Sequence, residues 1–181
     1  MKLNKTFLED VFILEPDYFT DERGGFARLY CQQELSKFYP GLEIKQINHS
    51  INRLAGTIRG MHFQYPPNDE IKFVKCTKGA VLDVVVDIRK GSKTFLKYLA
   101  VELTSNNNKM LCIPKGVAHG FQTLQDDTEL LYLHSAFYTP NNEGGLNFGD
   151  SKLNIDWVLP VQNISERDLN FKMLEDSFKG I

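Results

Sequence analysis

The chain has 181 residues, of which 42% are hydrophobic and 24% are charged, which is typical of a folded protein with one domain. Its net charge of −2 indicates no general attraction to nucleic acid or to an anionic membrane. No apolar run approaches a membrane span in length. The three isolated cysteines, Cys31, Cys76 and Cys112, lack the spacing of a zinc site or a disulfide framework.

The N-terminal segment MKLNKTFLEDVFILEP contains two lysines, but Glu9 and Asp10 interrupt its apolar stretch. That pattern makes a poor signal peptide, so we expect a cytoplasmic protein. A short helix is predicted near QQELSKFY, where Pro40 and Gly41 would end it.

Short β-rich runs separated by turn residues dominate the middle of the chain. FVKCT and AVLDVVVDI are predicted to form a hairpin around Lys78-Gly79. In the second run, alternate apolar residues from Ala80 to Ile88 share one face, and Asp83 and Asp87 lie on the other. TFLKYLAVEL, MLCIP, GFQTL and ELLYLHSAFY complete the series. This density of strands predicts an all-β sandwich, jelly roll or small barrel.

A second short helix is predicted after Ser165, because Ser165 and Asp168 have the spacing of a capping box. No repeat, low-complexity tract or linker divides the chain, so we expect a single domain over residues 1–181.

Two histidine segments suggest a more specific fold. GTIRGMHFQ places His62 and Gln64 on one face of a strand, and IPKGVAHGF ends its Pro-x-Gly-x-x-His pattern at His119. They resemble the two motifs of the cupin superfamily, whose fold is a jelly-roll barrel called a double-stranded β-helix. Metal-binding cupins carry His-x-His in the first motif, with a nearby Glu. Here Gln64 replaces the second histidine, and an amide is a poor metal ligand, so no metal is expected.

A narrower resemblance extends over nearly the whole chain. The segments DERGGF, RGMHFQYPP, KFVKCTKGAVLDVVVDIRKGSKTF, LCIPKGVAHGFQTL, ELLYLHSAFY, LNIDW and SERD occur in the order and approximate spacing of the dTDP-4-dehydrorhamnose 3,5-epimerase family. The resemblance implies a cupin-type jelly roll with short flanking helices and no cofactor. It also implies a homodimer in which an N-terminal arm crosses to the partner.

The family's reaction gives the polar residues a purpose. Its substrate is a nucleotide-linked 4-keto sugar, and a proton beside the ketone is removed from one face and returned to the other through an enolate. Such chemistry needs a base, a cation at the oxyanion and an acid across the ring. The resemblance implies His62 as base, Lys72 at the oxyanion, Tyr132 as acid and Asp168 as the carboxylate that orients the histidine.

Each assignment has a structural alternative that the sequence leaves open. Asp168 is also a candidate helix cap, Tyr132 a core residue of an apolar strand, and Lys72 a solvated lysine at a strand edge. A structural histidine under a turn is the alternative for His119, and this alternative is weaker for His62, which sits beside Arg59, Gln64 and Lys72.

Some further residues match family positions that face the substrate, and others are candidates for the same role. Arginine suits a diphosphate because its forked geometry fits phosphate oxygens, and aromatic faces suit a base or sugar. The candidates for substrate binding are Arg23, Phe26, Arg28, Arg59, Gln46, Asn48, His119, Tyr138 and Arg167.

Several departures from the family fall among these recognition residues. Arg28 stands where the family usually has Glu, and Phe137 stands where many relatives carry a second tyrosine. We therefore keep a GDP-linked 4-keto sugar, hexose or heptose, as an alternative substrate, and epimerisation at C3 alone as an alternative outcome. A sugar 3,4-ketoisomerase, a metal-dependent cupin enzyme and a non-catalytic sugar-nucleotide binding module are the remaining hypotheses.

Overall fold

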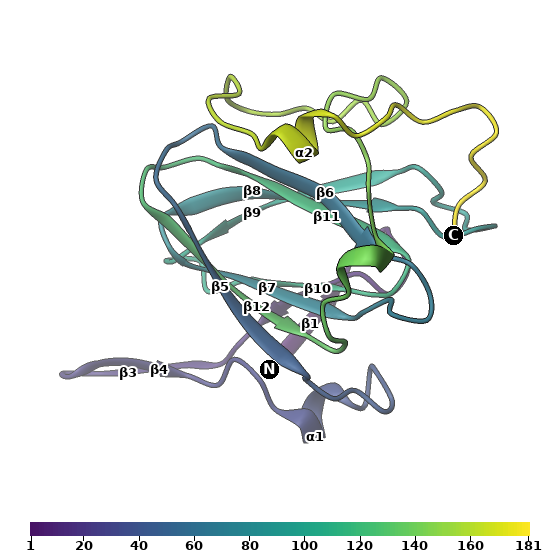
Figure 1. Ribbon diagram of the computed structural model, residues 1–181. Helices are drawn as coiled ribbons and strands as arrows, with labels where there is room; N and C mark the ends of the chain where they lie inside the picture. The colour runs from purple at the N-terminus through teal and green to yellow at the C-terminus, as the bar shows by residue number, and fades with distance from the viewer.

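Two antiparallel sheets lie face to face in the computed structural model, which describes all 181 residues (Figure 1). The six-stranded sheet has the order β1 (Lys2–Lys5), β2 (Phe12–Glu15), β10 (Met110–Ile113), β7 (Lys72–Lys78), β12 (Thr128–His134), β5 (Gln46–Asn52). The five-stranded sheet has the order β13 (Glu143–Gly145), β6 (Ile58–Gln64), β11 (Val117–Thr123), β8 (Ala80–Asp87), β9 (Tyr98–Thr104). The all-β jelly roll predicted from the sequence is confirmed.

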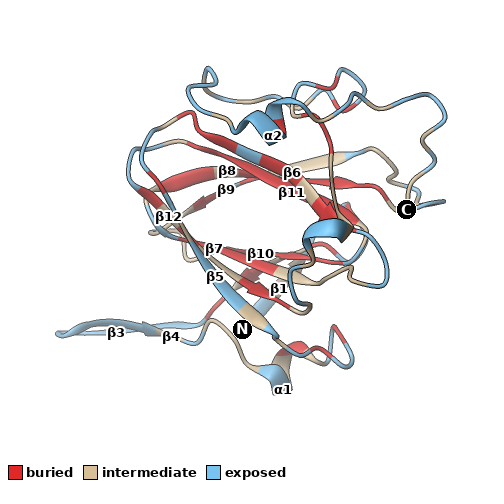
Figure 2. Cartoon of the chain, in the orientation of Figure 1, coloured by how far each residue is buried: buried red, intermediate tan, exposed pale blue.

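A third, two-stranded sheet projects from this body. It consists of β3 (Tyr18–Asp21) and β4 (Gly24–Ala27), and it extends away from the sandwich as a narrow hairpin (Figure 1). All four residues of β3 are exposed, and so are the first three of β4. The hairpin therefore buries little surface against its own chain (Figure 2).

The turn at Gly79 does not form the predicted hairpin. β7 pairs with β10 and β12 in one sheet, whereas β8 pairs with β11 and β9 in the other. Gly79 has φ +76°, a left-handed conformation that glycine adopts at little cost. The chain thus passes from one sheet to the other at this glycine. The turn residues correctly predicted that the strand ends here, but they did not predict which strands pair.

Three apolar layers hold the fold together. The first lies between the sheets and includes Val81, Val85 and Leu130. The second lies on the outer face of the six-stranded sheet, beneath α1 (Gln32–Leu35). The third lies on the outer face of the five-stranded sheet, where residues 146–181 cover Val84, Val86 and neighbouring strands. β8 is consequently buried on both faces, and Asp83 and Asp87 are enclosed instead of facing water (Figure 2).

Both predicted helices are present and short. α2 (Glu166–Leu169) begins after Ser165, whose hydroxyl accepts from the Asp168 amide at 3.1 Å. The other half of the predicted capping box is not formed, because both oxygens of the Asp168 carboxylate bond to β6. A single 3₁₀ turn, Pro140–Asn142, precedes β13. None of the helices is long and apolar enough to span a membrane.

Candidate active site

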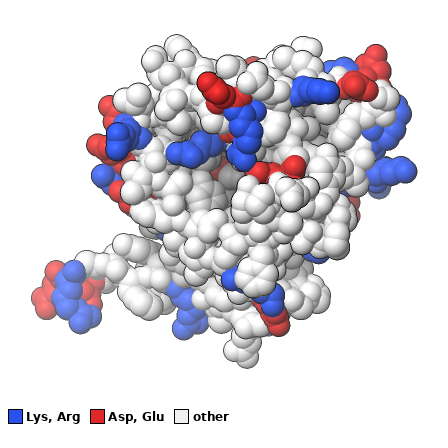
Figure 3. Space-filling view, in the orientation of Figure 1, with Lys and Arg blue, Asp and Glu red and all other residues white.

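A cavity of about 570 Å³ opens between the two sheets. β5, β7 and β12 form one wall, and β6 and β11 form the other. The space-filling view shows a hollow on this face, with acidic and basic side chains at its mouth (Figure 3). Most of the lining residues are polar. Because partly buried polar groups are costly without partners, their hydrogen bonds indicate how the site is organised.

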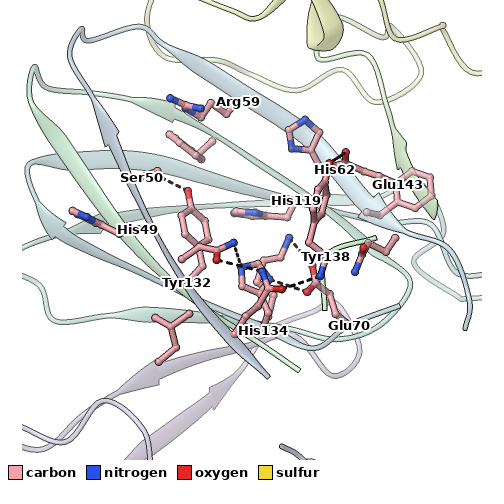
Figure 4. Close-up of a pocket in the computed structure, with 17 residues that line it drawn as sticks. His49, Ser50, Arg59, His62, Glu70, His119, Tyr132, His134, Tyr138 and Glu143 are labelled. Atoms are coloured by element: carbon pink, nitrogen blue, oxygen red, sulfur yellow. Dashed lines mark hydrogen bonds and ion pairs between the residues drawn. The ribbon is translucent and has the colours of Figure 1, made fainter. Parts of the chain in front are cut away.

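His62 projects into the cavity from β6 (Figure 4), and its ring is hydrogen-bonded to Asp168 of α2. His62 Nε2 lies 2.8 Å from Asp168 Oδ1, and the other carboxylate oxygen accepts from the Gly60 amide at 3.0 Å. A carboxylate can only accept, so Nε2 carries the hydrogen and Nδ1 keeps its lone pair. Arg167 Nη2, 2.9 Å from Nε2, is then an opposing donor that forms no hydrogen bond there.

Asp168 is almost fully buried, at 2% exposure. Burial by itself would raise the pKa of Asp168, but the hydrogen bonds from His62 and the Gly60 amide outweigh it and lower the pKa to about 2. The carboxylate is therefore ionised at neutral pH and favours the Nε2–H tautomer of His62. Neither of its oxygens caps α2, so the reading of Asp168 as a helix cap is wrong.

Lys72 enters the cavity from the opposite sheet. Its Nζ lies 3.2 Å from Glu70 Oε1, and Glu70 Oε2 lies 2.7 Å from His134 Nδ1. All three side chains are at most 13% exposed. Burial would raise the pKa of Glu70, but the hydrogen bond from His134 and the charge of Lys72 together lower it. Lys72 is thus a paired cation that is largely shielded from solvent, instead of a solvated lysine at the strand edge.

Tyr132 lies between two histidines on the six-stranded side of the cavity. Its ring stacks on His134 with an interplanar angle of 25°, and His119 approaches its edge. The hydroxyl lies 3.2 Å from Ser50 Oγ (Figure 4). Desolvation raises the pKa of Tyr132 above its ordinary value, so the phenol keeps its proton at neutral pH.

His119 stands opposite His62 in the β11–β6 register and is 5% exposed. Its Nε2 lies 2.9 Å from the buried carboxylate of Asp83. Desolvation lowers the pKa of His119, which disfavours the charged imidazolium.

Two arginines flank His62. Arg59 donates from Nε to Asn52 Oδ1 at 2.7 Å, and its guanidinium lines the main cavity. Arg167 donates to Glu143 at 2.7 Å and to Asp168 at 3.1 Å. The two arginines also line a second hollow of about 330 Å³ on the far side of His62. This side of the site presents donors suited to an anion.

Most of the residues predicted for the site come together. Those that line the main cavity are Gln46, Asn48, Arg59, His62, Lys72, His119, Tyr132 and Tyr138. Asp168 and Arg167 border it through His62. At the rim, the Gln46 side chain accepts from the Tyr138 amide at 2.8 Å and donates to Asn48 at 3.3 Å.

Three predicted residues lie away from the cavity of this chain. Arg23 sits at the tip of the β3–β4 hairpin, where it pairs with Asp21, and Phe26 of β4 is 69% exposed. Arg28 pairs with Glu34 of α1 at 3.2 Å. No side chain of the cavity contacts them, so any role for them at a substrate site requires a second chain.

Glu70, His134, Ser50 and Glu143 line the cavity but were not predicted as site residues. The partners of Glu70 are a lysine and a histidine. Gln64 is occupied by backbone groups of the loops around it, accepting from Thr139 and donating to Asn68. No group of three or more His, Cys, Asp or Glu side chains is arranged to hold a metal ion.

Comparisons with known proteins agree with this geometry. The family described as dTDP-4-dehydrorhamnose 3,5-epimerase matches residues 5–176. The chain is 41% identical to the dTDP-4-dehydrorhamnose 3,5-epimerase of Shigella flexneri over 180 residues, which cover 98% of each protein.

Two solved structures are similar throughout. The dTDP-4-dehydrorhamnose 3,5-epimerase of Bacillus anthracis, solved with TDP and pyrophosphate bound, has a TM-score of 0.92 and 35% identity over 96% of this chain and 99% of that chain. A dTDP-6-deoxy-D-glucose-3,5-epimerase of Legionella pneumophila, in complex with dTDP-4-keto-L-rhamnose, has a TM-score of 0.90 and 33% identity over 95% and 92%. The family predicted from the sequence motifs is therefore confirmed, and the chain belongs to the dTDP-4-dehydrorhamnose 3,5-epimerase family.

Proposed function

We propose that this protein is an isomerase that inverts C3, C5 or both in a nucleotide-linked 4-keto sugar, and that it serves the synthesis of surface polysaccharide sugars. One observation carries the proposal. A histidine oriented by a buried carboxylate and a protonated tyrosine face the same cavity from opposite sheets. A base and an acid on opposite walls are what inversion of a carbon between them requires.

In the proposed reaction, His62 Nδ1 takes the proton from the carbon beside the ketone. The C–H electron pair becomes the C=C bond of an enolate, and the former ketone oxygen becomes an oxyanion. The Tyr132 hydroxyl then returns a proton to the opposite face, and the resulting phenolate is reprotonated from solvent while the imidazolium releases its proton. No net oxidation occurs, so the cycle needs no redox cofactor.

Lys72 is the proposed electrophile of this cycle. An ammonium held in a water-poor cavity stabilises a developing oxyanion far more than one in bulk water does. Glu70 fixes the position of the Lys72 ammonium before the substrate arrives, although the negative charge of Glu70 offsets part of the positive potential of Lys72.

Recognition of the nucleotide diphosphate is proposed for residues that surround this centre. Arg59 and Arg167 offer guanidinium donors on the His62 side, as diphosphate binding demands. Gln46, Asn48, His119 and Tyr138 are proposed to contact the sugar or phosphates, since all of them line the cavity.

We also propose that the active protein is a homodimer. Tyr18, Phe19 and Phe26 give the β3–β4 hairpin large exposed apolar surface, and β5 exposes Ile47 and Ile51. The Nζ of Lys75, on the outer face of β7, is buried without a hydrogen-bond partner, which a carboxylate from another chain would correct. In this assembly the hairpin brings Arg23, Phe26 and Arg28 towards the partner's nucleotide site.

The cytoplasm is the proposed site of action. All three cysteines are free, and two of them, Cys76 and Cys112, are buried in apolar layers. Free thiols persist in reducing compartments. We treat residues 1–181 as one functional domain, with the hairpin as its intersubunit arm.

The relatives favour the dTDP-linked 4-keto-6-deoxyhexose over the GDP-linked alternative, because those matched above are named for dTDP sugars. Solvent exchange provides the direct test. The protein is incubated in D₂O with dTDP- or GDP-linked 4-keto sugar, and the product mass is followed. Two deuteriums with the dTDP sugar are expected from inversion at C3 and C5, and one would indicate a single centre. A product without deuterium from both the dTDP- and the GDP-linked sugar, or a product with a migrated ketone, would overturn the proposal.

A further inference from the structure

Glu70 and His134 form a largely enclosed pair beside the proposed reacting groups, and the proposed reaction does not use this pair. Glu70 sits just before β7, and His134 is the last residue of β12. Glu70 divides its two oxygens, one to Lys72 at 3.2 Å and one to His134 at 2.7 Å. A single carboxylate therefore holds both the proposed electrophile and the histidine (Figure 4).

The hydrogen bonds fix the orientation of the His134 ring. Nδ1 must carry the hydrogen, because the Glu70 carboxylate can only accept. Nε2 then has a lone pair, and the Asn48 side-chain amide, 3.4 Å away, is placed to donate to it. Both ring nitrogens of a neutral His134 are thus matched to partners.

The fixed ring supports the proposed acid. His134 and Tyr132 lie two residues apart on β12, on the same face, and their rings stack with centroids 6.0 Å apart. Tyr132 also approaches His119 in an edge arrangement, contacts Ser50 through its hydroxyl and packs against the apolar layer between the sheets. The His134 ring, which Glu70 orients, therefore helps to fix the plane of the Tyr132 ring.

We propose that Glu70 and His134 are positioning residues of the epimerase, an inference that rests on the function proposed above. Glu70 fixes the ammonium of Lys72, and His134 fixes the ring of Tyr132. His62, on the opposite sheet, and its partner Asp168 make no hydrogen bond to Glu70 or His134, so proton abstraction and proton delivery are supported by separate groups.

Deuterium partitioning separates this role from a merely structural one. Enolate formed by His62 either returns to substrate or proceeds to product through Tyr132. In D₂O, His134→Leu keeps the volume but removes the stacking ring, so product formation should fall about three- to tenfold, the equivalent of one aromatic pair. Deuterium in recovered substrate should rise relative to product. His134→Phe restores a ring and should bring this ratio back towards wild type.

Glu70→Gln tests the other contact without altering the ring. Lys72 stabilises the enolate needed by both outcomes, so product formation and exchange should fall together, by about tenfold or more for one charge-assisted hydrogen bond. If the pair acts as a unit, the double variant with His134→Leu should lose much less than the product of the two single effects.

Glu129→Gln is the matched control, because Glu129 also pairs with a histidine of the six-stranded sheet, His49 at 3.1 Å, but does not itself line the cavity, although His49 does. It should retain wild-type rates. Thermal unfolding of each variant establishes that it is folded. Wild-type turnover in Glu70→Gln, or an unchanged deuterium ratio in a slow His134→Leu, would overturn the positioning role alone. Absence of exchange in the unmodified protein would overturn the proposed function and this inference with it.

Discussion

Asp168 and Asp87, two of the buried carboxylates, share a design at the level of single residues, whereas the buried Asp83 leaves one oxygen without a hydrogen-bond partner. Asp168 divides its oxygens between His62 and the Gly60 amide, and Asp87 divides its own among Arg89, Ser92 and Thr94. Each site satisfies both oxygens, which offsets the cost of removing a charge from water. The carboxylate is thus a fixed point around which neighbouring groups are oriented.

His62 and Tyr132 should fail in different ways when they are altered. His62→Asn and Tyr132→Phe should each lower turnover at least ~10²-fold through loss of general acid–base catalysis. His62→Asn should also abolish deuterium uptake, because no enolate forms. Tyr132→Phe should still admit deuterium into recovered substrate. Near-normal turnover in either variant, measured by product mass, would remove that residue from the mechanism.

Asp168 should make stability depend on pH in the acid range. Its pKa is about 2 in the folded protein against an ordinary 3.8, so its stabilisation is complete above about pH 4. The stabilisation, about 2 kcal/mol, should disappear as the pH falls towards 2. Asp87, whose pKa is also about 2, should add a similar amount.

Urea unfolding between pH 6 and pH 2 provides the check. Asp168→Asn should be less stable than the unmodified protein at pH 6, and the difference should narrow as the pH falls. A constant difference over that range would show that Asp168 is not ionised in the folded state.

Close approach of β6 and β11 is the feature at the level of elements that sets the site. Gly60 has φ +120°, and a Cβ there would lie 2.5 Å from the Cα of Gly120 and 2.8 Å from the His119 carbonyl oxygen. Two glycines thus let His62 and His119 stand opposite each other on tightly apposed strands. The same Gly60 amide binds Asp168, so strand geometry and the orientation of His62, the proposed base, are connected.

Gly60→Ala should therefore damage stability and activity together. The left-handed φ and the backbone clash should cost more than about 1 kcal/mol of unfolding free energy. Denaturant unfolding measures the loss. Gly24→Ala is the control, since it also has positive φ but no atom lies within 4 Å of its added Cβ. Equal effects of the two changes would mean that the clash with β11 is unimportant.

The sequence predicted the strands better than their partners. Alternation and turn residues identified β7 and β8, yet the glycine between them carries the chain into the other sheet, and no local signal distinguishes that from a hairpin. Glu70 and His134 are 64 positions apart in the sequence, so neither segment by itself predicts that the two side chains pair. Residues that match a family motif, such as His62 and Lys72, were identifiable because the motif stands for a three-dimensional arrangement.

The outer faces of the two sheets are shielded from solvent to different extents. Residues 146–181 shield the outer face of the five-stranded sheet, and α1 with its neighbours shields part of the six-stranded sheet. β5 and the β3–β4 hairpin remain exposed with apolar side chains such as Ile51, at 59% exposure, and Phe19. A second chain on this side would bury them, which is the basis of the proposed dimer.

Ile51→Asp should therefore shift the protein from dimer to monomer, because a buried unpaired carboxylate at an interface is unfavourable. Sedimentation velocity measures the change. Val158→Asp is the control, since Val158 is equally exposed, at 61%, but lies in the C-terminal covering segment. A monomeric unmodified protein, or a dimer that Ile51→Asp leaves intact, would contradict the proposed interface.

The placement of the two proposed proton-transfer groups, His62 and Tyr132, on different sheets has a consequence for how the protein can evolve. Packed sheets lie about 10 Å apart, and the side chains between them determine that spacing. Val85 and Leu130, deep in the layer between the sheets, thus help set the width of the gap in which a sugar ring must fit between His62 and Tyr132. A substitution that changes the volume of this layer should then also change the distance between His62 and Tyr132. Stabilising substitutions here are therefore expected to alter the turnover rate as well.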